Sequence, residues 1–191
     1  AGFLGSLFWR FERGLADLGG LSLAVGIALA EAWRAQGLDV RVKWPNDLWI
    51  DGRKLAGLLV EAGGEFHGPS HAVVGLGLNI ALPPAIRDAL GQPVTDLATH
   101  LPDAMPRNVA VAICIDALFA ALQEFDREGF SPFVARWGAV DALVDHGVTV
   151  HEANGCWTGI ARGIDDRGRL QVQTEAAMRV VDAGEISIRL A

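Results

Sequence analysis

The chain has 191 residues, a formal net charge of −7 at pH 7 and 51% hydrophobic residues, with 23 glycines in addition. This length allows one or two domains with a substantial core, and the apolar content excludes an intrinsically disordered chain. The acidic balance argues against a protein that binds nucleic acid through a broad basic surface, so we expect no nucleic-acid partner for this chain.

The first half of the chain predicts one buried helix followed by extended segments. Residues 21–36 are apolar on nearly every face of a helix that Gly37 would end. The most apolar part of this helix is about half as long as a membrane-spanning helix, so we expect no membrane partner. Short strands joined by turns predict an antiparallel or mixed sheet. We expect these strands at residues 40–44, 48–50, 54–61 and 72–80, with a hairpin turn at Asp51-Gly52.

The second half predicts more helices and then a small β domain. Residues 83–107 are irregular, with one short helix near residues 95–100, and Asn108 is expected to cap a long helix that ends at Gly129. Ser131-Pro132 opens another helix. The apolar face of the long helix would consist of Val111, Ile115, Leu118, Leu122 and Phe125.

From Gly147 onward the pattern changes to short alternating strands, which predict a five-stranded barrel. The strands are expected at residues 148–152, 156–162, 169–174, 179–181 and 185–190. We therefore expect two domains, at residues 1–145 and 146–191.

Cysteine and histidine residues give no sign of a metal site. Cys114 and Cys156 lie far apart, which suits a reduced, cytoplasmic protein and offers no metal-ligand spacing. His67 and His71 lie in a Gly-Pro loop without helical spacing. We therefore expect that the side chains of this protein hold no metal of their own.

The two lysines are the most informative charged residues. Of 16 basic residues, only Lys43 and Lys54 are lysine. A chain that uses arginine so freely keeps lysine where a compact ammonium is needed, although two ordinary surface lysines explain the count as well. The hairpin pairs Trp49 with Lys54 and Asp47 roughly with Ala56, so Asp47 and Lys54 should share one face of the sheet. Such a pair suits a site for a phosphate and a carboxylate, and an exposed ion pair is the alternative.

Three glycines fall within the predicted strands next to this pair. Gly57, Gly75 and Gly77 weaken a strand unless a ligand or another backbone approaches closely. A helix packed tightly on the sheet is the alternative explanation. Gly75-Leu76-Gly77 is not a dinucleotide-binding loop, because the third glycine and the following helix are missing.

Three motifs follow one another at characteristic spacing. They are Lys43-Trp44-Pro45-Asn46-Asp47-Leu48, the segment GRKLAGLLVE at residues 52–61, and Val74-Gly75-Leu76-Gly77-Leu78-Asn79. By these motifs the chain resembles the biotin–protein ligase family. Phe8-Trp9-Arg10 and residues 159–165 and 184–187 are similar to the family as well. The resemblance therefore covers essentially the whole chain.

The resemblance implies a fold and an activity. The fold would be α/β (α+β): a catalytic domain like class II aminoacyl-tRNA synthetases and biotin synthetases, with a mixed sheet and flanking helices, plus a small SH3-like C-terminal barrel. The activity would condense biotin and ATP, with Mg²⁺ on the phosphates, to biotinyl-5′-AMP. The biotinyl group would then pass to a lysine of a biotin carboxyl carrier protein, a subunit of acetyl-CoA carboxylase. Many relatives form homodimers through their central sheets.

The resemblance also implies roles for the residues at matching positions. Lys54 would approach the biotin carboxylate and the α-phosphate, where it would stabilise developing charge. Asp47 would orient the reacting groups or help the incoming lysine to lose its proton. The biotin slot would be formed by Lys54, Gly57, Leu59, Gly75 and Gly77. ATP and the adenylate would be bound by Lys43, Asn46, Asn79 and, in the tail, Arg189.

The chain also departs from the family pattern. The Gly-Arg-rich loop that orders the substrates, G-R-G-R-x-G, is missing from this sequence, as are an upstream Ser-Thr-Asn stretch and the winged helix of repressor members. Because the chain begins with Ala1, we expect a truncated form with impaired activity. Two alternatives stay open: a catalytically incomplete module for binding or dimerisation, and a relative that activates lipoate or another acid.

Overall fold

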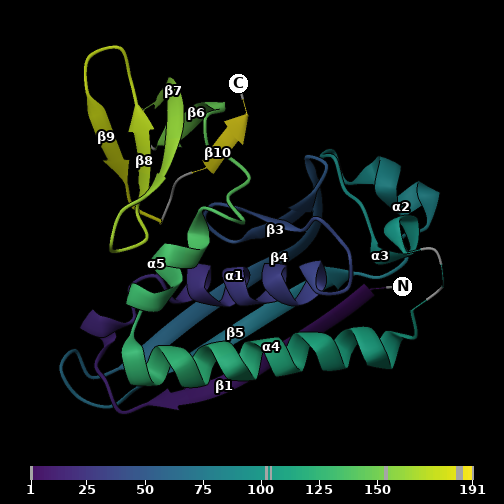
Figure 1. Ribbon diagram of the computed structural model, residues 1–191, viewed down its shortest axis with the longest axis horizontal. Coiled ribbons are helices and arrows are strands. Elements are labelled where there is room, and N and C mark those ends of the chain that lie inside the picture. The colour runs from purple at the N-terminus through teal and green to yellow at the C-terminus, as the bar shows by residue number, and fades with distance from the viewer. Residues whose placement is uncertain (1, 102, 104, 153–154, 184–186, 191) are drawn as a thin grey trace.

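The computed structural model describes residues 2–101, 103, 105–152, 155–183 and 187–190. Two five-stranded antiparallel sheets organise the chain (Figure 1). The strands of the first sheet stand in the order β1-β5-β4-β3-β2. They are β1 (Gly2–Phe11), β2 (Arg41–Lys43), β3 (Asp47–Ile50), β4 (Arg53–Gly64) and β5 (Ser70–Asn79). Parallel pairing occurs at two isolated bridges, Val42 with Asp141 and Lys54 with Val94.

The first strand, β1, is not among the elements that we predict from the sequence. Its residues alternate between exposed and half-buried along its length, and it pairs with the whole of β5. Glycine, serine and leucine on its outer face give little contrast in polarity to the apolar inner face. The period of two is therefore weak in the sequence although it is clear in the structure.

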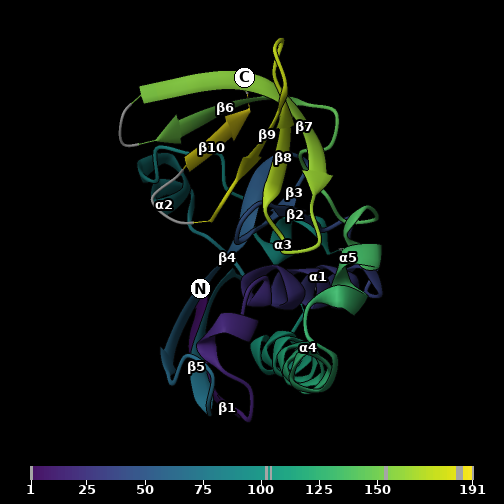
Figure 2. The ribbon, with the colours of Figure 1, turned by 90° about the vertical axis from the view of Figure 1, so that its left-hand side faces the viewer.

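Helices cover one face of the first sheet. The buried helix α1 (Leu21–Arg34) lies directly against the sheet, and α4 (Arg107–Glu128) packs beside it on the same side (Figure 2). Gly26 of α1 lies near Val42 and Leu58, with room for no more than a methyl group. Helix and sheet thus approach closely at this glycine, where alanine would also fit. The strand glycines Gly57, Gly75 and Gly77 lie on the half-exposed positions of β4 and β5, so tight helix packing does not explain them.

The long helix α4 differs from its prediction at its start and on its buried face. It begins at Arg107 after Pro106, and no side chain caps it, so Asn108 lies inside the first turn. Ile115 is exposed and Val111 is only half-buried, whereas the small residues Cys114 and Ala121 are buried. Small residues face inward because α4 packs closely against α1. By length and composition alone α4 could cross a membrane, and one of its faces is part of the core.

The segment before α4 contains two short helices where one was predicted. They are α2 (Pro84–Ala89) and α3 (Leu97–His100), and Asp96 caps α3 by accepting a hydrogen bond from the Thr99 N–H at 2.9 Å. After α4, α5 (Ser131–Trp137) leads to the second sheet, and the short 3-10 helix η1 (Leu15–Asp17) precedes α1.

The second sheet has the strand order β10-β6-β7-β8-β9, and its strand count agrees with the prediction. Among the described residues the pairing does not close between β9 and β10, so the predicted barrel is an open, bent sheet there. The first predicted turn falls partly on residues 153–154 and the last predicted strand on 185–186, which lie outside the described residues. The strands are β6 (Gly147–Glu152), β7 (Gly155–Ile164), β8 (Leu170–Gln173), β9 (Met178–Val181) and β10 (Ser187–Leu190).

The turn between β7 and β8 attaches the second sheet to the rest of the chain. The Gly168 N–H donates to the Asp165 carbonyl at 3.1 Å within this turn, as predicted. The fully buried indole of Trp44 donates from Nε1 to the Gly168 carbonyl at 3.0 Å. The second sheet is therefore held beside the loop that joins β2 to β3.

Candidate active site

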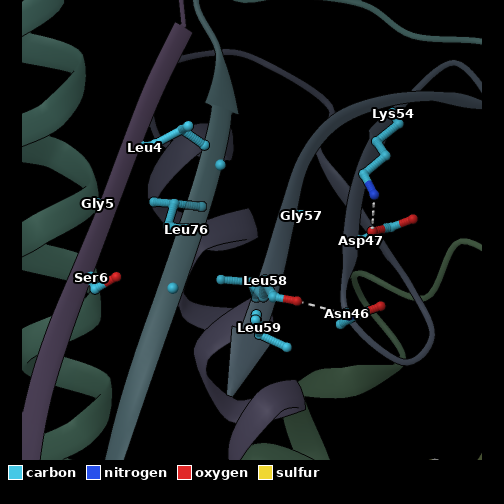
Figure 3. A pocket seen from close by; sticks show the side chains of 12 residues that line it. Leu4, Gly5, Ser6, Asn46, Asp47, Lys54, Gly57, Leu58, Leu59 and Leu76 are labelled. Atoms are coloured by element: carbon cyan, nitrogen blue, oxygen red, sulfur yellow. Dashed lines mark hydrogen bonds and ion pairs between the residues drawn. The ribbon is translucent and has the colours of Figure 1, made fainter. Parts of the chain in front are cut away.

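A groove of about 610 Å³ lies on the face of the first sheet that no described helix covers (Figure 3). Strands β1, β4 and β5 form its floor, and the turn before β3 forms one wall. Its lining includes seven of the predicted site residues, Asn46, Asp47, Lys54, Gly57, Leu59, Gly75 and Gly77. The structure therefore brings most of the predicted site together in one cavity.

Lys54 and Asp47 form an ion pair at the edge of this groove. Lys54 Nζ lies 2.6 Å from Asp47 Oδ1, and the two side chains are 29% and 15% exposed. The predicted pairing of Asp47 with Ala56 is wrong by one residue, because Asp47 lies opposite Gly57 and Leu48 opposite Ala56. A register shift between Leu48 and Trp49 produces this difference, and it leaves Leu55 as the extra residue of β4.

Glycine makes the floor of the groove flat. Gly57 pairs with Gly77, so two positions without side chains lie directly beside the ion pair. A Cβ at Gly57 would lie 3.0 Å from Nζ of Lys54, whereas a Cβ at Gly75 would have its nearest neighbour at 3.5 Å. The glycines therefore leave space that a flat ligand can fill, and Gly57 also makes room for the lysine itself.

Asn46 fixes the turn that carries Asp47. Its Nδ2 donates to the Leu58 carbonyl at 2.7 Å, and the Leu58 N–H donates to the Asn46 carbonyl at 2.9 Å (Figure 3). These two bonds attach the turn to β4. The position of Asp47 relative to Lys54 is thus set by backbone contacts on both sides.

Lys43 and Arg189 lie near the groove without being part of its lining. Lys43 is paired across the sheet with Asp47, and its Nζ lies 5.3 Å from the centre of the Trp49 ring. Burial lowers the pKa of the Lys43 ammonium, Asp47 opposes this, and the charges of Lys54 and Arg189 lower the pKa further. The charge of Arg189, on the second sheet, therefore acts on Lys43 of the first sheet.

Asn79 lies at the end of β5 and is not among the residues that line the groove. Its Nδ2 lies 3.3 Å from the Lys54 carbonyl and 3.0 Å from the Thr95 carbonyl. The amide group thus connects two backbone segments, which the sequence alone did not indicate.

The sequence reasoning missed the contribution of β1. Leu4, Gly5 and Ser6 line the groove, and Leu4 is 87% exposed. The sequence holds no signal for this part of the groove, because Leu4-Gly5-Ser6 shows no alternation of polarity. His71 stacks on Phe8 further along the same face, and no group of three metal-ligating side chains occurs among the described residues.

Comparison with known proteins relates the chain to biotin protein ligases. A family model described as "Biotin/lipoate A/B protein ligase family" matches residues 5–79, and "Biotin protein ligase C terminal domain" matches residues 147–189. "Biotin--[acetyl-CoA-carboxylase] ligase" of Paracoccus denitrificans is 30% identical over 190 residues, which are 96% of this chain and 79% of that protein. "Bifunctional ligase/repressor BirA" of Salmonella typhimurium is 40% identical over 187 residues, or 97% of this chain.

This chain spans 58% of the length of that BirA protein. Among solved structures, the biotin protein ligase from Aquifex aeolicus in complex with biotin and ATP superposes with a TM-score of 0.77 at 22% identity. The match covers 98% of this chain and 79% of the Aquifex chain. The expected fold class, an α/β catalytic domain like class II synthetases with a C-terminal β domain, is confirmed.

Proposed function

Because this chain belongs to the biotin protein ligase family, we propose that it forms biotinyl-5′-AMP from biotin and ATP and transfers biotin to a lysine of a biotin carboxyl carrier protein. One observation carries the proposal: the Lys54–Asp47 ion pair at the edge of a groove whose floor is the Gly57–Gly77 pair. A flat, apolar bicyclic ring suits that floor, and the ion pair suits the reacting carboxylate.

In the first step, a carboxylate oxygen of biotin attacks the α-phosphorus of ATP and pyrophosphate leaves. Lys54 contributes a compact ammonium beside both reacting groups, where negative charge builds up on the phosphoryl oxygens. Its side chain is mostly buried, which strengthens this attraction relative to water. Leu59 and Gly75, paired across β4 and β5, extend the slot for the ring beyond Gly57 and Gly77.

In the second step, the lysine amine of the carrier attacks the carbonyl carbon of the adenylate and AMP leaves. Asp47 accepts the proton that this amine must lose, or orients the amine for attack. Lys54 pairs with Oδ1 of Asp47. The proton of the amine would therefore go to the second carboxylate oxygen, Oδ2, or to Oδ1 after Lys54 has turned toward the phosphate.

The nucleotide is proposed to lie on the side of Lys43, Asn46, Asn79 and Arg189. Lys43 and Lys54 both lie beside Asp47, and the charge of Arg189 acts on Lys43, so positive charge is available to a triphosphate there. Mg²⁺ takes few protein carboxylates and several phosphate oxygens, and Asp47 is the carboxylate beside the two lysines. Asp47 would be the carboxylate nearest to a metal that arrives on ATP, and that metal would neutralise phosphate charge.

The partners and the location belong to the same proposal. The carrier is a subunit of acetyl-CoA carboxylase, which the name of the Paracoccus relative supports. A homodimer is supported by the exposed apolar side chains of the open sheet face, Leu4, Phe8 and Leu59. A cytoplasmic location is supported by the free cysteines Cys114 and Cys156.

The test is biotin-dependent exchange of pyrophosphate into ATP by the 191-residue chain and its variants. Lys54→Ala is expected to abolish exchange, and Lys54→Arg is expected to fail as well, because a planar fork cannot replace a compact ammonium. Arg53→Ala on the same hairpin, where the side chain is exposed, is the matched control and should keep exchange. Exchange near the unsubstituted level in Lys54→Ala would refute the proposed role of Lys54. No biotin-dependent exchange by the unsubstituted chain or by any variant would favour the alternative of a catalytically incomplete module.

A further inference from the structure

The backbone of Lys54 has a second hydrogen-bonded neighbour that is not part of the sheet. Strand β5 pairs with β4 only from Ala56 to Gly64, so the start of β4 would otherwise have a free edge. The segment 93–95 takes that place: the Lys54 N–H donates to the Pro93 carbonyl at 3.0 Å, and the Thr95 N–H donates to the Lys54 carbonyl at 2.9 Å. Residues 93–96 are called the brace below.

Asn79 joins the brace to the sheet. Its Nδ2 lies within hydrogen-bond distance of two carbonyls, 3.3 Å from that of Lys54 and 3.0 Å from that of Thr95. One side-chain amide thus holds the backbone of the proposed catalytic lysine and the backbone of the brace at a common point.

Asp96 anchors the brace from its other end. It is 1% exposed, and its Oδ2 accepts from the Leu82 N–H and from Arg87, each at 2.6 Å. Its Oδ1 accepts from the Thr99 N–H at 2.9 Å and from the Thr99 hydroxyl at 2.7 Å. Burial acts to raise the pKa of this carboxyl, but the bonds from Leu82 and Thr99 and the charge of Arg87 keep it below its usual value. Asp96 is therefore an ionised anchor at neutral pH.

These contacts hold the two ends of residues 82–96 together, because the Leu82 N–H bonds to the carboxylate of Asp96, which belongs to the brace. The Ala98 N–H adds a bond to the Ile80 carbonyl at 3.0 Å on the far side of Asp96. Asp96 is thus a fixed point between α2 and Lys54, so a movement of α2 would not shift the Lys54 backbone.

We propose that the brace sets the position of Lys54 relative to Asp47, and that Asp96 and Asn79 are positioning residues for the Lys54–Asp47 pair. The expected effect on adenylate formation rests on the proposed function, whereas the expected effect on the position of Lys54 does not. The tip of Lys54 pairs with Asp47 and its backbone bonds to the brace, so a shift of that backbone changes the geometry of the pair. A misplacement of about 1 Å at a reacting group can cost on the order of 100-fold in rate, so loss of the brace should lower the rate of adenylate formation.

The test uses Asp96→Asn, which removes the charge and sets an NH₂ group against two of the four donors to Asp96, whichever way the amide turns. Arg87→Gln is a milder second variant that removes the ion pair and leaves the carboxylate in place. Asp165→Asn is the matched control. Asp165 also accepts two backbone N–H bonds and an arginine, but in the β7–β8 turn.

Because the chain contains two lysines, a protein labelled with ¹³C at lysine Cε gives two side-chain signals, which Lys43→Arg assigns. Asp96→Asn and Arg87→Gln are expected to shift the Lys54 signal by more than Asp165→Asn does. The kcat of pyrophosphate exchange should fall about tenfold or more in Asp96→Asn, with KM for biotin within about twofold.

A Lys54 signal that stays in place in folded Asp96→Asn would overturn the proposal. If Asp96→Asn does not fold, the same result in Arg87→Gln would overturn it. The signals can be read even if the chain makes no adenylate, so failure of the brace and failure of the proposed function give different results.

Discussion

Gly57→Ala tests how closely the lysine and the groove floor are fitted to each other. The added Cβ would lie 3.0 Å from both Cε and Nζ of Lys54 and 3.3 Å from Oδ1 of Asp47. Carbon atoms prefer about 3.5–4.0 Å, so the end of Lys54 must move by roughly 0.5 Å. If about 1 Å of misplacement costs about 100-fold, this displacement should cost about tenfold in adenylation, or about 1.4 kcal/mol.

The stability of the fold should change much less than the activity. Gly57 is not among the described residues with positive φ, and the atoms that the new methyl group meets belong to the movable end of a side chain. Replacing glycine at such a position stabilises by about 0.4–1 kcal/mol through the unfolded chain, which offsets the local crowding. We expect the free energy of unfolding to stay within about 1 kcal/mol of the unsubstituted chain.

Urea unfolding and biotin-dependent pyrophosphate exchange measure the two quantities. Gly138→Ala is the control, because a Cβ there has no neighbour within 4 Å. Folded Gly57→Ala with exchange equal to that of Gly138→Ala would refute the argument that the tip of Lys54 must sit where the glycine leaves room. A large loss of stability in Gly57→Ala would refute it as well, because the methyl group would then be meeting rigid atoms.

Two further predictions concern the attachment and the turn of the second sheet. Trp44→Phe leaves the buried Gly168 carbonyl without its donor and should cost about 1–3 kcal/mol of unfolding free energy in urea, with Trp157→Phe, whose indole is half-buried, losing less. Equal losses in the two variants would contradict this. Asp165 is partly buried, which raises its pKa, but bonds from Arg169 and Arg167 lower the pKa below 3.8 overall. The stability that it adds should be full above about pH 4 and lost as pH falls through the folded pKa. The difference in unfolding free energy between the unsubstituted chain and Asp165→Asn should therefore shrink from pH 7 to pH 3, and a constant difference would argue against an ionised anchor.

The sequence predicted that Asp47 and Lys54 share one face of the sheet because the signals for this placement are local. A two-residue Asp-Gly turn and an alternation of period two are enough to place Asp47 and Lys54 on one face. The bulge escaped prediction, although Leu55 and Ala56 are consecutive buried residues and so interrupt that alternation. The exact partner of Asp47 depended on this single extra residue.

Local turn and alternation signals do not predict contacts between distant parts of the chain. Nothing local shows that Thr95 would pair with Lys54, or that Asn79 would donate to both of their carbonyls. The assignment of Arg189 to the nucleotide came from family resemblance, and the proximity of its charge to Lys43 supports that assignment. The groove wall from β1 was missed because Leu4, Gly5 and Ser6 show no polarity pattern.

The bond from Trp44 to Gly168 also dictates an order of events during synthesis. The two residues are 124 positions apart, so a ribosome that adds about 5–20 residues per second makes the donor roughly 6–25 s before the acceptor. Arg136 and its partner Glu31 are separated by 105 positions in the same way. In the nascent chain, the Lys-Trp-Pro-Asn-Asp segment is therefore made well before Gly168, and Trp44 has no acceptor at Gly168 until the C-terminal quarter emerges. A chain released before Gly168 is made lacks the acceptor of this bond and leaves the Trp44 indole accessible to chaperones and proteases.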